Sequence, residues 1–303
     1  MKALLKWTWR ITALIVVVAA LACVGVFWIS ESRLDRTYDV RPAPVPVASD
    51  AAAIERGRHI ATIRGCIDCH GGNLGGGVFL DDPMIGRFAA SNLTRGKGGV
   101  GASYGEQDWV RAIRHGIRPN GKPLLVMPSG EFYGLSDADT ADLIAYVKSV
   151  PPVDNVLAAS ALSPFGRVIT TLNRDIAVLP AERIDHAAPR PPAPVAGVTP
   201  EYGRYLASSC VNCHGETFSG GRIPGVPPQW PPAPNLTPLP GAALARWSDA
   251  GFAATLRSGT TPEGRQLDNR YMPWKVVGQM TDDEMKALWL YLRSLPPKAA
   301  GNR

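Results

Sequence analysis

Residues 66–70 read Cys-Ile-Asp-Cys-His, and residues 210–214 read Cys-Val-Asn-Cys-His. Cys-x-x-Cys-His is the pattern at which c-type haem is attached covalently. Its two thiols bond the two vinyl groups of one porphyrin, and the imidazole that follows lies under the iron as the proximal ligand. A single copy could mark a redox dithiol. Two copies predict that this chain carries two covalently bound haems.

A methionine followed by proline lies at nearly the same distance after each motif. Met127 follows His70 by 57 positions, and Met272 follows His214 by 58. A thioether sulfur suits iron opposite histidine and raises its reduction potential. An isolated methionine is usually core filler, but the repeated spacing predicts that Met127 and Met272 are the distal ligands. The remaining methionines of the two halves lack this spacing, namely Met84, Met280 and Met285.

The two motifs belong to an internal repeat with an offset of about 144 residues. Residues 57–61 parallel residues 203–207, and the triplet Asn-Leu-Thr occurs at 92–94 and again at 235–237. Residues 109–116 parallel residues 252–259. A fixed internal offset indicates two similar structural units in tandem.

Each unit is predicted to begin and end with a helix. The first helices cover about residues 52–64 and 200–208. The last helices start at the capping signals of residues 136–139 and 281–284 and stop at Pro-Pro pairs. We expect Tyr146 and Tyr291 to pack on Gly57 and Gly203, where first and last helices cross. The intervening stretches are rich in Gly and Pro, so we predict an all-α fold with almost no ordered strand.

An apolar segment, Ile11–Ile29, lacks charged residues and is long enough to span a bilayer. Basic residues precede it, so the N-terminus is expected in the cytoplasm. A cleaved signal peptide is the alternative, but the apolar run is long and the sequence around Trp28 is a poor cleavage site. We therefore favour an uncleaved anchor. Residues 20–23, Ala-Leu-Ala-Cys, weakly resemble a bacterial lipoprotein box, but the residues after Cys23 stay apolar, which favours a plain membrane position for this cysteine.

Two proline-rich stretches, residues 41–46 and 189–196, are predicted to be extended spacers. Between the units, residues 163–179 (the strap) carry apolar residues at roughly helical spacing and are expected to pack on both units. The predicted organisation is a cytoplasmic terminus (1–10), an anchor (11–29), a spacer (30–50), a first domain (51–155), a strap and linker (156–198), a second domain (199–297) and a tail (298–303).

The net charge of +6 would allow nucleic-acid binding. An exported haem protein seldom meets nucleic acid, and four haem propionates would offset most of this charge, so we predict no nucleic-acid partner. Arg114 and Arg257 occupy equivalent places in the repeat and are candidates for propionate partners, with an ordinary surface position as the alternative.

The order of these motifs resembles class I cytochrome c domains over about residues 51–297. More specifically, it resembles the cytochrome c subunits of membrane-bound bacterial dehydrogenases that oxidise alcohols, gluconate or aldehydes. Such subunits typically hold three haems, whereas this chain has two motifs. The resemblance implies one haem on Cys66, Cys69, His70 and Met127, and a second on Cys210, Cys213, His214 and Met272.

The leading functional prediction is a dihaem electron carrier on the periplasmic face of a bacterial inner membrane. It would take electrons from a dehydrogenase or quinol-oxidising complex and pass them to a terminal oxidase or soluble cytochrome. Iron held by His and Met has no open position for a substrate.

Two alternatives stay open: a dihaem subunit of a cbb3-type oxidase, and a dihaem peroxidase or thiosulfate-oxidising enzyme. The enzymes need an open iron site, or one held by a further histidine or cysteine. No cysteine remains in either soluble half. Of the other histidines, His59 is expected to be structural, His115 to lie at the surface and His186 in the linker.

Overall fold

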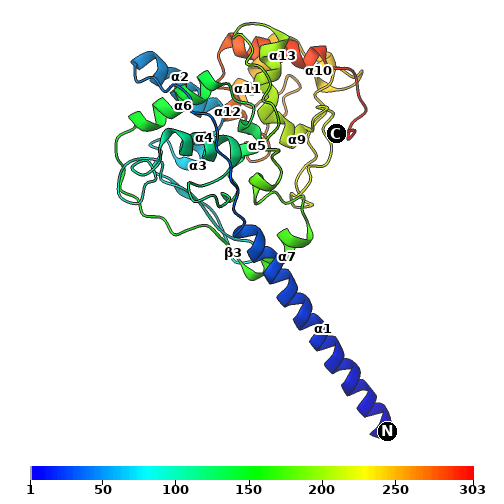
Figure 1. Cartoon of the computed structure of the whole chain (residues 1–303). Coiled ribbons are helices and arrows are strands. Elements are labelled where there is room, and N and C mark those ends of the chain that lie inside the picture. Colours follow the sequence, from blue (N-terminus) through cyan, green and yellow to red (C-terminus); the bar gives the residue numbers. More distant parts are fainter. Residues whose placement is uncertain (1) are drawn as a thin grey trace.

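The computed structural model describes residues 2–303, as one long helix and a globular part of two helical repeats (Figure 1). The long helix, α1 (Lys2–Leu34), contains the predicted anchor and extends it at both ends. Its segment Leu5–Leu34 has a mean hydropathy of 2.7, and none of the most apolar part is buried against the protein. By length and composition it could cross a membrane.

The first repeat (residues 51–155) and the second repeat (residues 199–297) share five helices in the same order, and the second repeat adds the short elements η2 (Ala207–Cys210) and α10 (Ala243–Arg246). In the first repeat these are α2 (Ala51–Ile63), α3 (Cys66–His70), α4 (Glu106–His115), α5 (Ser129–Phe132) and α6 (Asp137–Ser149). The second repeat has α8 (Pro200–Leu206), η2 (Ala207–Cys210), α9 (Val211–His214), α10 (Ala243–Arg246), α11 (Asp249–Ser258), α12 (Trp274–Val277) and α13 (Asp282–Ser294). Between them lie α7 (Pro164–Leu172) and η1 (Pro180–Glu182).

The predicted helix crossing is confirmed in both repeats. A Cβ added to Gly57 would lie 1.9 Å from the carbonyl oxygen of Asp142 and 2.8 Å from Cβ of Tyr146. A Cβ on Gly203 would lie 1.9 Å from the carbonyl oxygen of Ala287 and 2.8 Å from Cβ of Tyr291. Only glycine allows the two helix backbones to approach this closely. The predicted N-caps are also present, since Ser136 caps α6 and Thr281 begins a capping box at α13.

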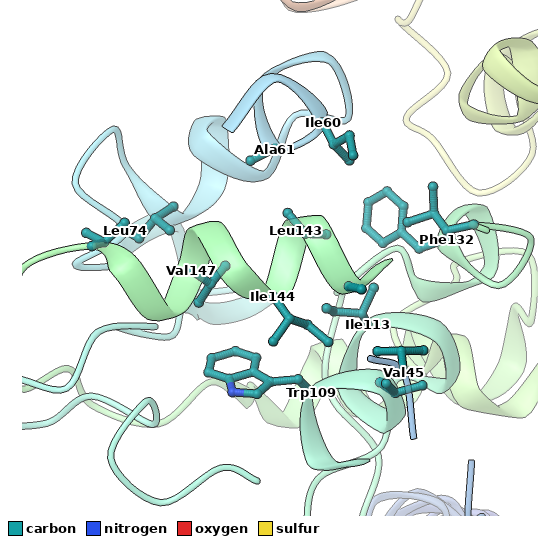
Figure 2. Close-up of a cluster of buried hydrophobic side chains, with 14 residues drawn as sticks. Val45, Ile60, Ala61, Leu74, Trp109, Ile113, Phe132, Leu143, Ile144 and Val147 are labelled. Atoms are coloured by element: carbon teal, nitrogen blue, oxygen red, sulfur yellow. The ribbon is translucent and has the colours of Figure 1, made fainter. Parts of the chain in front are cut away.

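The core of the first repeat forms where α2, α4 and α6 meet (Figure 2). Figure 2 shows Leu143, Ile144 and Val147 projecting from α6 between the other two helices. Trp109 lies on the α4 side of this cluster. The second repeat has an equivalent core, in which Leu288 and Leu292 of α13 pack with Phe252 of α11.

The prediction of almost no strand is wrong for the first repeat. Strands β1 (Gly77–Asp82) and β2 (Gly86–Ala90) form an antiparallel hairpin, and β3 (Ala161–Leu162) extends it at the β2 edge. The Asp82 side chain accepts hydrogen bonds from the backbone N–H groups of Met84 and Ile85, which closes the turn. At the corresponding place in the second repeat the chain is rich in proline, which cannot donate to a ladder, and one bridge pairs Gly221 with Ala233.

The strap packs on the repeats as predicted, but only some of its apolar residues make the contact. Val178 and Leu179 are buried and form a small core with Phe88 and Leu162. Helix α7, in contrast, leaves two of its large apolar side chains outside. Phe165 is 48% exposed and Leu172 is 72% exposed.

The two repeats pack against each other through the segments that precede the Cys-x-x-Cys-His motifs. Buried Arg64 donates to Ser208 Oγ at 3.1 Å and to Ser209 Oγ at 2.6 Å, and it also donates to backbone carbonyls at the end of α8. Tyr205 packs on the core of the first repeat, and Ile63 packs in the core of the second. Each repeat therefore completes part of the other's core.

His59 and Glu284 form a second link between the repeats, with His59 Nε2 at 2.8 Å from Glu284 Oε2. The carboxylate raises the pKa of His59 above its ordinary value of 6.5. Burial would raise the pKa of Glu284, but hydrogen bonds from His59 and Thr281 bring it below 4.5. The charged imidazole of His59 contributes to the stability of the fold below pH 6.5, and this contribution is lost as the pH rises through the raised pKa of His59. The carboxylate's contribution is present above pH 4.5 and is lost as the pH falls through the lowered pKa.

We therefore predict that His59→Gln destabilises the protein most between pH 4.5 and 6.5, where both groups are charged. The expected loss is about 1 kcal/mol, because the pair is only partly shielded from water. Guanidinium unfolding followed by circular dichroism at pH 5.5 and at pH 8.5 measures it. As a control, Arg58→Gln breaks an exposed pair with Glu55 and should have no measurable effect at either pH. An equal loss for His59→Gln at both pH values would contradict this account.

Candidate haem sites

The first Cys-x-x-Cys-His motif and its predicted methionine line one cavity. Cys66, Cys69 and His70 reach it from α3, and Met127 reaches it from the loop before α5. The remaining walls are mostly apolar and come from the loop after α3, from the hairpin and from α4, α5 and α6; they include Leu74, Phe79, Trp109, Ile113, Phe132, Leu143 and Val147. Helix α3 begins after Gly65, whose φ of +71° lets the chain turn sharply out of α2.

Both motif histidines are buried, and one nitrogen of each is fixed in the same way. His70 Nδ1 lies 2.8 Å from the carbonyl oxygen of Ser91, and His214 Nδ1 lies 2.9 Å from that of Pro234. Burial lowers the pKa of both imidazoles, so they stay neutral. A neutral imidazole that donates from Nδ1 presents a lone pair on Nε2, which is the arrangement of a metal-binding histidine.

The four motif cysteines are free thiols in the structure. Burial raises the pKa of Cys66 and of Cys210 to about 12. A redox-active Cys-x-x-Cys pair needs a lowered thiol pKa, because the thiolate is the attacking species. The environment of these thiols therefore disfavours the redox dithiol that a single motif left open.

The two predicted distal ligands occupy equivalent positions. Met127 packs on the core of the first repeat and Met272 on that of the second. The proline after each methionine is the N-cap of a short helix, α5 after Pro128 and α12 after Pro273. A proline is well tolerated where a helix begins, and this position accounts for the proline that follows each methionine. In the second repeat Cys210 contacts the same core as Met272.

A buried donor of the first repeat supplies an independent test of whether the cavity suits a haem. Trp109 lines the cavity, and its Nε1–H is buried with no acceptor among residues 2–303. Buried N–H groups without a partner are rare in proteins, and a haem propionate is an acceptor that could satisfy this one. The cavity therefore suits a haem, because it combines two thiols, a neutral imidazole, a thioether, apolar walls and a free donor. The second repeat has Phe252 at the equivalent position, which cannot donate.

Arg114 and Arg257 make equivalent contacts within their own repeats, and the alternative of an ordinary surface position is wrong for Arg114, which is 2% exposed. Arg114 donates to the carbonyl oxygens of Leu135 and Ser136 and pairs with Asp137 at 2.8 Å. Arg257 donates to the carbonyl oxygen of Gly278 and pairs with Asp282 at 2.8 Å. Both arginines therefore tie a helix of their own repeat to the start of its last helix.

His115 is buried, so the prediction of a surface position is wrong. Its Nδ1 lies 3.1 Å from Nδ1 of His186, and its ring packs edge-on against Tyr133. Burial, with further contributions from His186 and neighbouring arginines, lowers its pKa to about 4. This pair attaches the linker to the first repeat. Neither histidine lines the cavity that contains His70.

The Asn-Leu-Thr triplets are visible in the sequence as a repeat, but their role appears only in the structure. Asn92 Nδ2 donates to the carbonyl oxygen of Val153 at 2.7 Å, and Asn235 Nδ2 donates to that of Lys298 at 2.8 Å. Each triplet thus holds the loop after the motif against the chain that leaves the last helix. The acceptors of the histidine Nδ1–H groups, Ser91 and Pro234, directly precede the two triplets. Repetition of the triplets was the only signal of these acceptors in the sequence.

The first repeat thus has a cavity that suits a haem attached through Cys-x-x-Cys-His, and the second repeat reproduces the histidine and methionine contacts; the family comparison agrees. The Cytochrome c family model matches residues 54–151 and 201–296, so the chain belongs to the cytochrome c family. Membership implies covalently bound haem c, with its iron, and a role in electron transport.

The chain is similar to cytochrome subunits of dehydrogenases. It is 28% identical over 285 residues to the fructose dehydrogenase cytochrome subunit of Gluconobacter japonicus, covering 84% of this chain and 55% of that protein. It is 26% identical over 280 residues to the cytochrome c subunit of the quinone alcohol dehydrogenase of Gluconobacter oxydans, covering 84% and 57%. A shorter match, 35% identical over 109 residues, is to the gluconate 2-dehydrogenase cytochrome c subunit of Pantoea cypripedii, covering 34% and 24%. The chain thus spans about half the length of the first two relatives.

Proposed function

We propose that this chain is a membrane-anchored dihaem cytochrome c that relays single electrons. The observation that carries this proposal is the cavity in which Cys66, Cys69, His70 and Met127 come together among apolar side chains. Helix α1 is the proposed single-pass anchor, with its N-terminus in the cytoplasm and both repeats, each one haem domain, in the periplasm.

The proposed roles of the site residues are the same in the two repeats. Cys66 and Cys69 would bond one porphyrin, and Cys210 and Cys213 the other. His70 and His214 would be proximal iron ligands, oriented by the backbone carbonyls that accept from their Nδ1–H groups. Met127 and Met272 would be the distal ligands. Haem iron held by His and Met takes up and releases one electron at a time and leaves no position for a substrate.

The interface between the repeats supports a relay within one chain. Arg64 precedes the first motif and contacts the serines that precede the second. Asn212, inside the second motif, donates to Glu131 of α5. Burial raises the pKa of Glu131 to about 7, in spite of this bond. The two attachment segments are therefore held together by polar contacts, an arrangement expected of two haem sites that exchange electrons.

The relatives support a dehydrogenase partner. Two of them are named as cytochrome subunits of fructose and quinone alcohol dehydrogenases. We propose that this chain accepts electrons from a membrane-bound dehydrogenase or a quinol-oxidising complex, and that a terminal oxidase or a soluble cytochrome accepts them from it. A sugar, alcohol or aldehyde would then be the substrate of the partner.

The test of this function compares electron transfer with peroxide turnover. The purified, reduced full chain is mixed with an oxidised soluble cytochrome c, and separately with hydrogen peroxide, in a stopped-flow spectrophotometer. We expect the cytochrome to oxidise both haems quickly and peroxide to be consumed only slowly. Rapid catalytic consumption of peroxide would reject the carrier and favour a dihaem peroxidase.

A further inference from the structure

Helix α7 carries its apolar side chains on its outer face, where Phe165 and Leu172 are exposed and Ile169 is half-buried. Phe165, Ile169 and Leu172 share one face at helical spacing, and two of the three are prominently exposed, at 48% and 72%. The face that packs on the protein is formed instead by small or polar residues, with Gly166 and Thr170 buried. A helix of a globular protein normally faces its core with the apolar side. The reversal indicates that the outer face of α7 meets an apolar environment outside this chain.

Helix α7 lies directly against the end of the proposed anchor. Arg33 of α1 donates to the carbonyl oxygen of Thr170 at 2.8 Å and pairs with Glu182 at 2.7 Å. Arg167 of α7 packs over the ring of Phe27, 4.7 Å from its centroid, and pairs with Glu31 at 2.5 Å. Figure 1 shows α7 and β3 beside the end of α1 that joins the globular part. These contacts fix the apolar face of α7 at the level where α1 leaves the apolar span.

The turn of the β1–β2 hairpin lies beside the start of α7. Ser163, the N-cap of α7, donates its hydroxyl to the carbonyl oxygen of Met84, and its N–H donates to that of Ile85 at 3.1 Å. Met84 is 57% exposed. The exposed apolar surface is therefore shared by the helix and the adjoining turn. We call Phe165, Ile169, Leu172 and Met84 the base patch.

We infer that the base patch rests in the interface of the lipid bilayer, where headgroups meet acyl chains. This inference depends on the proposed function only in its use of α1 as a membrane anchor. An interfacial helix buries an apolar face in that boundary and keeps basic residues at its margin. Arg167 lies on α7, and Arg174 follows its last turn with an exposed side chain. Lipid is the occupant favoured by this geometry, because α7 is held by direct contacts against the end of the helix that would leave the bilayer.

The base patch would give α1 a second role besides tethering. A single helix joined by a flexible linker would let the globular part tumble above the membrane. Ion pairs on two sides of α1 and an apolar contact at α7 would instead hold one side of the first repeat against the bilayer. The hairpin whose turn contains Met84 also lines the first haem cavity, where Phe79 and Ala89 are wall residues. The inference therefore places the hairpin wall of that cavity toward the membrane surface.

Photo-crosslinking in the full-length haem-loaded protein tests this placement. The variants are Leu172→p-benzoylphenylalanine and Phe165→p-benzoylphenylalanine, each irradiated in native membranes and examined by mass spectrometry of the modified peptide. We expect lipid adducts at both positions. Val195 of the linker, which is 88% exposed, is the matched control and should form no lipid adduct. Unchanged haem absorption spectra show that each variant is folded.

A fourth variant, Val18→p-benzoylphenylalanine in the middle of α1, separates the two possible failures. Lipid adducts at position 18 but none at 165 and 172 would overturn the base patch and leave the anchor intact. Adducts with another protein at 165 or 172 would also overturn it, and would show that a partner subunit covers this face. No lipid adduct at position 18 would reject the anchor itself, and the base patch with it.

Discussion

Met127→Ala is expected to remove one of two sulfur-to-iron charge-transfer bands in the near infrared and to lower one of two reduction potentials. The thioether favours the reduced iron, so its loss stabilises the oxidised state. Axial ligands tune haem potentials over roughly 0.8 V, so we expect a decrease on the order of 0.2 V. The second component should keep its band and its potential, because Met272 contacts a separate core. A spectroelectrochemical titration with magnetic circular dichroism measures both effects.

Two matched variants make the assignment specific. Met272→Ala should remove the other band and lower the other potential. Met84→Ala removes an exposed methionine of the same repeat and should change neither. If Met127→Ala retains both bands, the distal ligand of the first repeat is another residue and the spacing argument fails.

Gly57→Ala is expected to destabilise the first repeat severely. The new Cβ would lie 1.9 Å from the carbonyl oxygen of Asp142, which belongs to a helix backbone and cannot rotate away. The α2–α6 crossing must therefore open, and this crossing shapes the core beside the first haem cavity. Overpacking typically costs 1–3 kcal/mol and occasionally more; with backbone as the obstacle we expect about 3 kcal/mol or more. Domains are stable by only about 5–15 kcal/mol in total.

The measurement is guanidinium unfolding of the haem-loaded protein, followed by circular dichroism. Gly203→Ala should have the same effect on the second repeat, since its Cβ would also lie 1.9 Å from a helix carbonyl oxygen. Gly130→Ala is the control, because its Cβ would meet only the Ile184 side chain, at an ordinary 3.9 Å. Equal stability of Gly57→Ala and Gly130→Ala would contradict the packing described for the crossing.

Features that occur twice could be predicted from the sequence. The crossing at Gly57 and Gly203, the tyrosines that cover it and the caps of the last helices were each visible as a pair, so chance was easy to exclude. The hairpin of residues 77–90 is a counterexample. Its second-repeat counterpart is rich in proline, so the repeat offered no confirming copy, and glycines on both sides suggested a loop.

The strap shows what helical spacing leaves undecided. Its apolar residues predicted a helix and a contact, but the spacing does not say which side the contact is on. Gly166 and Thr170 allow close packing of their own face, and this places Phe165 and Leu172 outside. The interface between the repeats could not be predicted either. Arg64 makes its contacts with Ser208 and Ser209, which lie 144 and 145 positions away in the sequence.

The candidate site likewise has residues that the sequence predicts and contacts that it does not predict. The thiols, imidazoles and thioethers follow from a motif and a spacing, and in the first repeat the structure brings all four predicted residues to one cavity. Backbone acceptors such as the Ser91 carbonyl carry no side-chain signature. His115 was predicted at the surface from its place beside Arg114, whereas Arg114 is itself 2% exposed.

The most direct test of the account is a redox titration of the purified full chain, combined with a count of covalent haem by alkaline pyridine spectroscopy. The account predicts two haems per polypeptide that stay attached after denaturation, and two one-electron components, each with a near-infrared sulfur-to-iron band. One haem per chain, a haem removed by acid acetone, or a component without that band would contradict it.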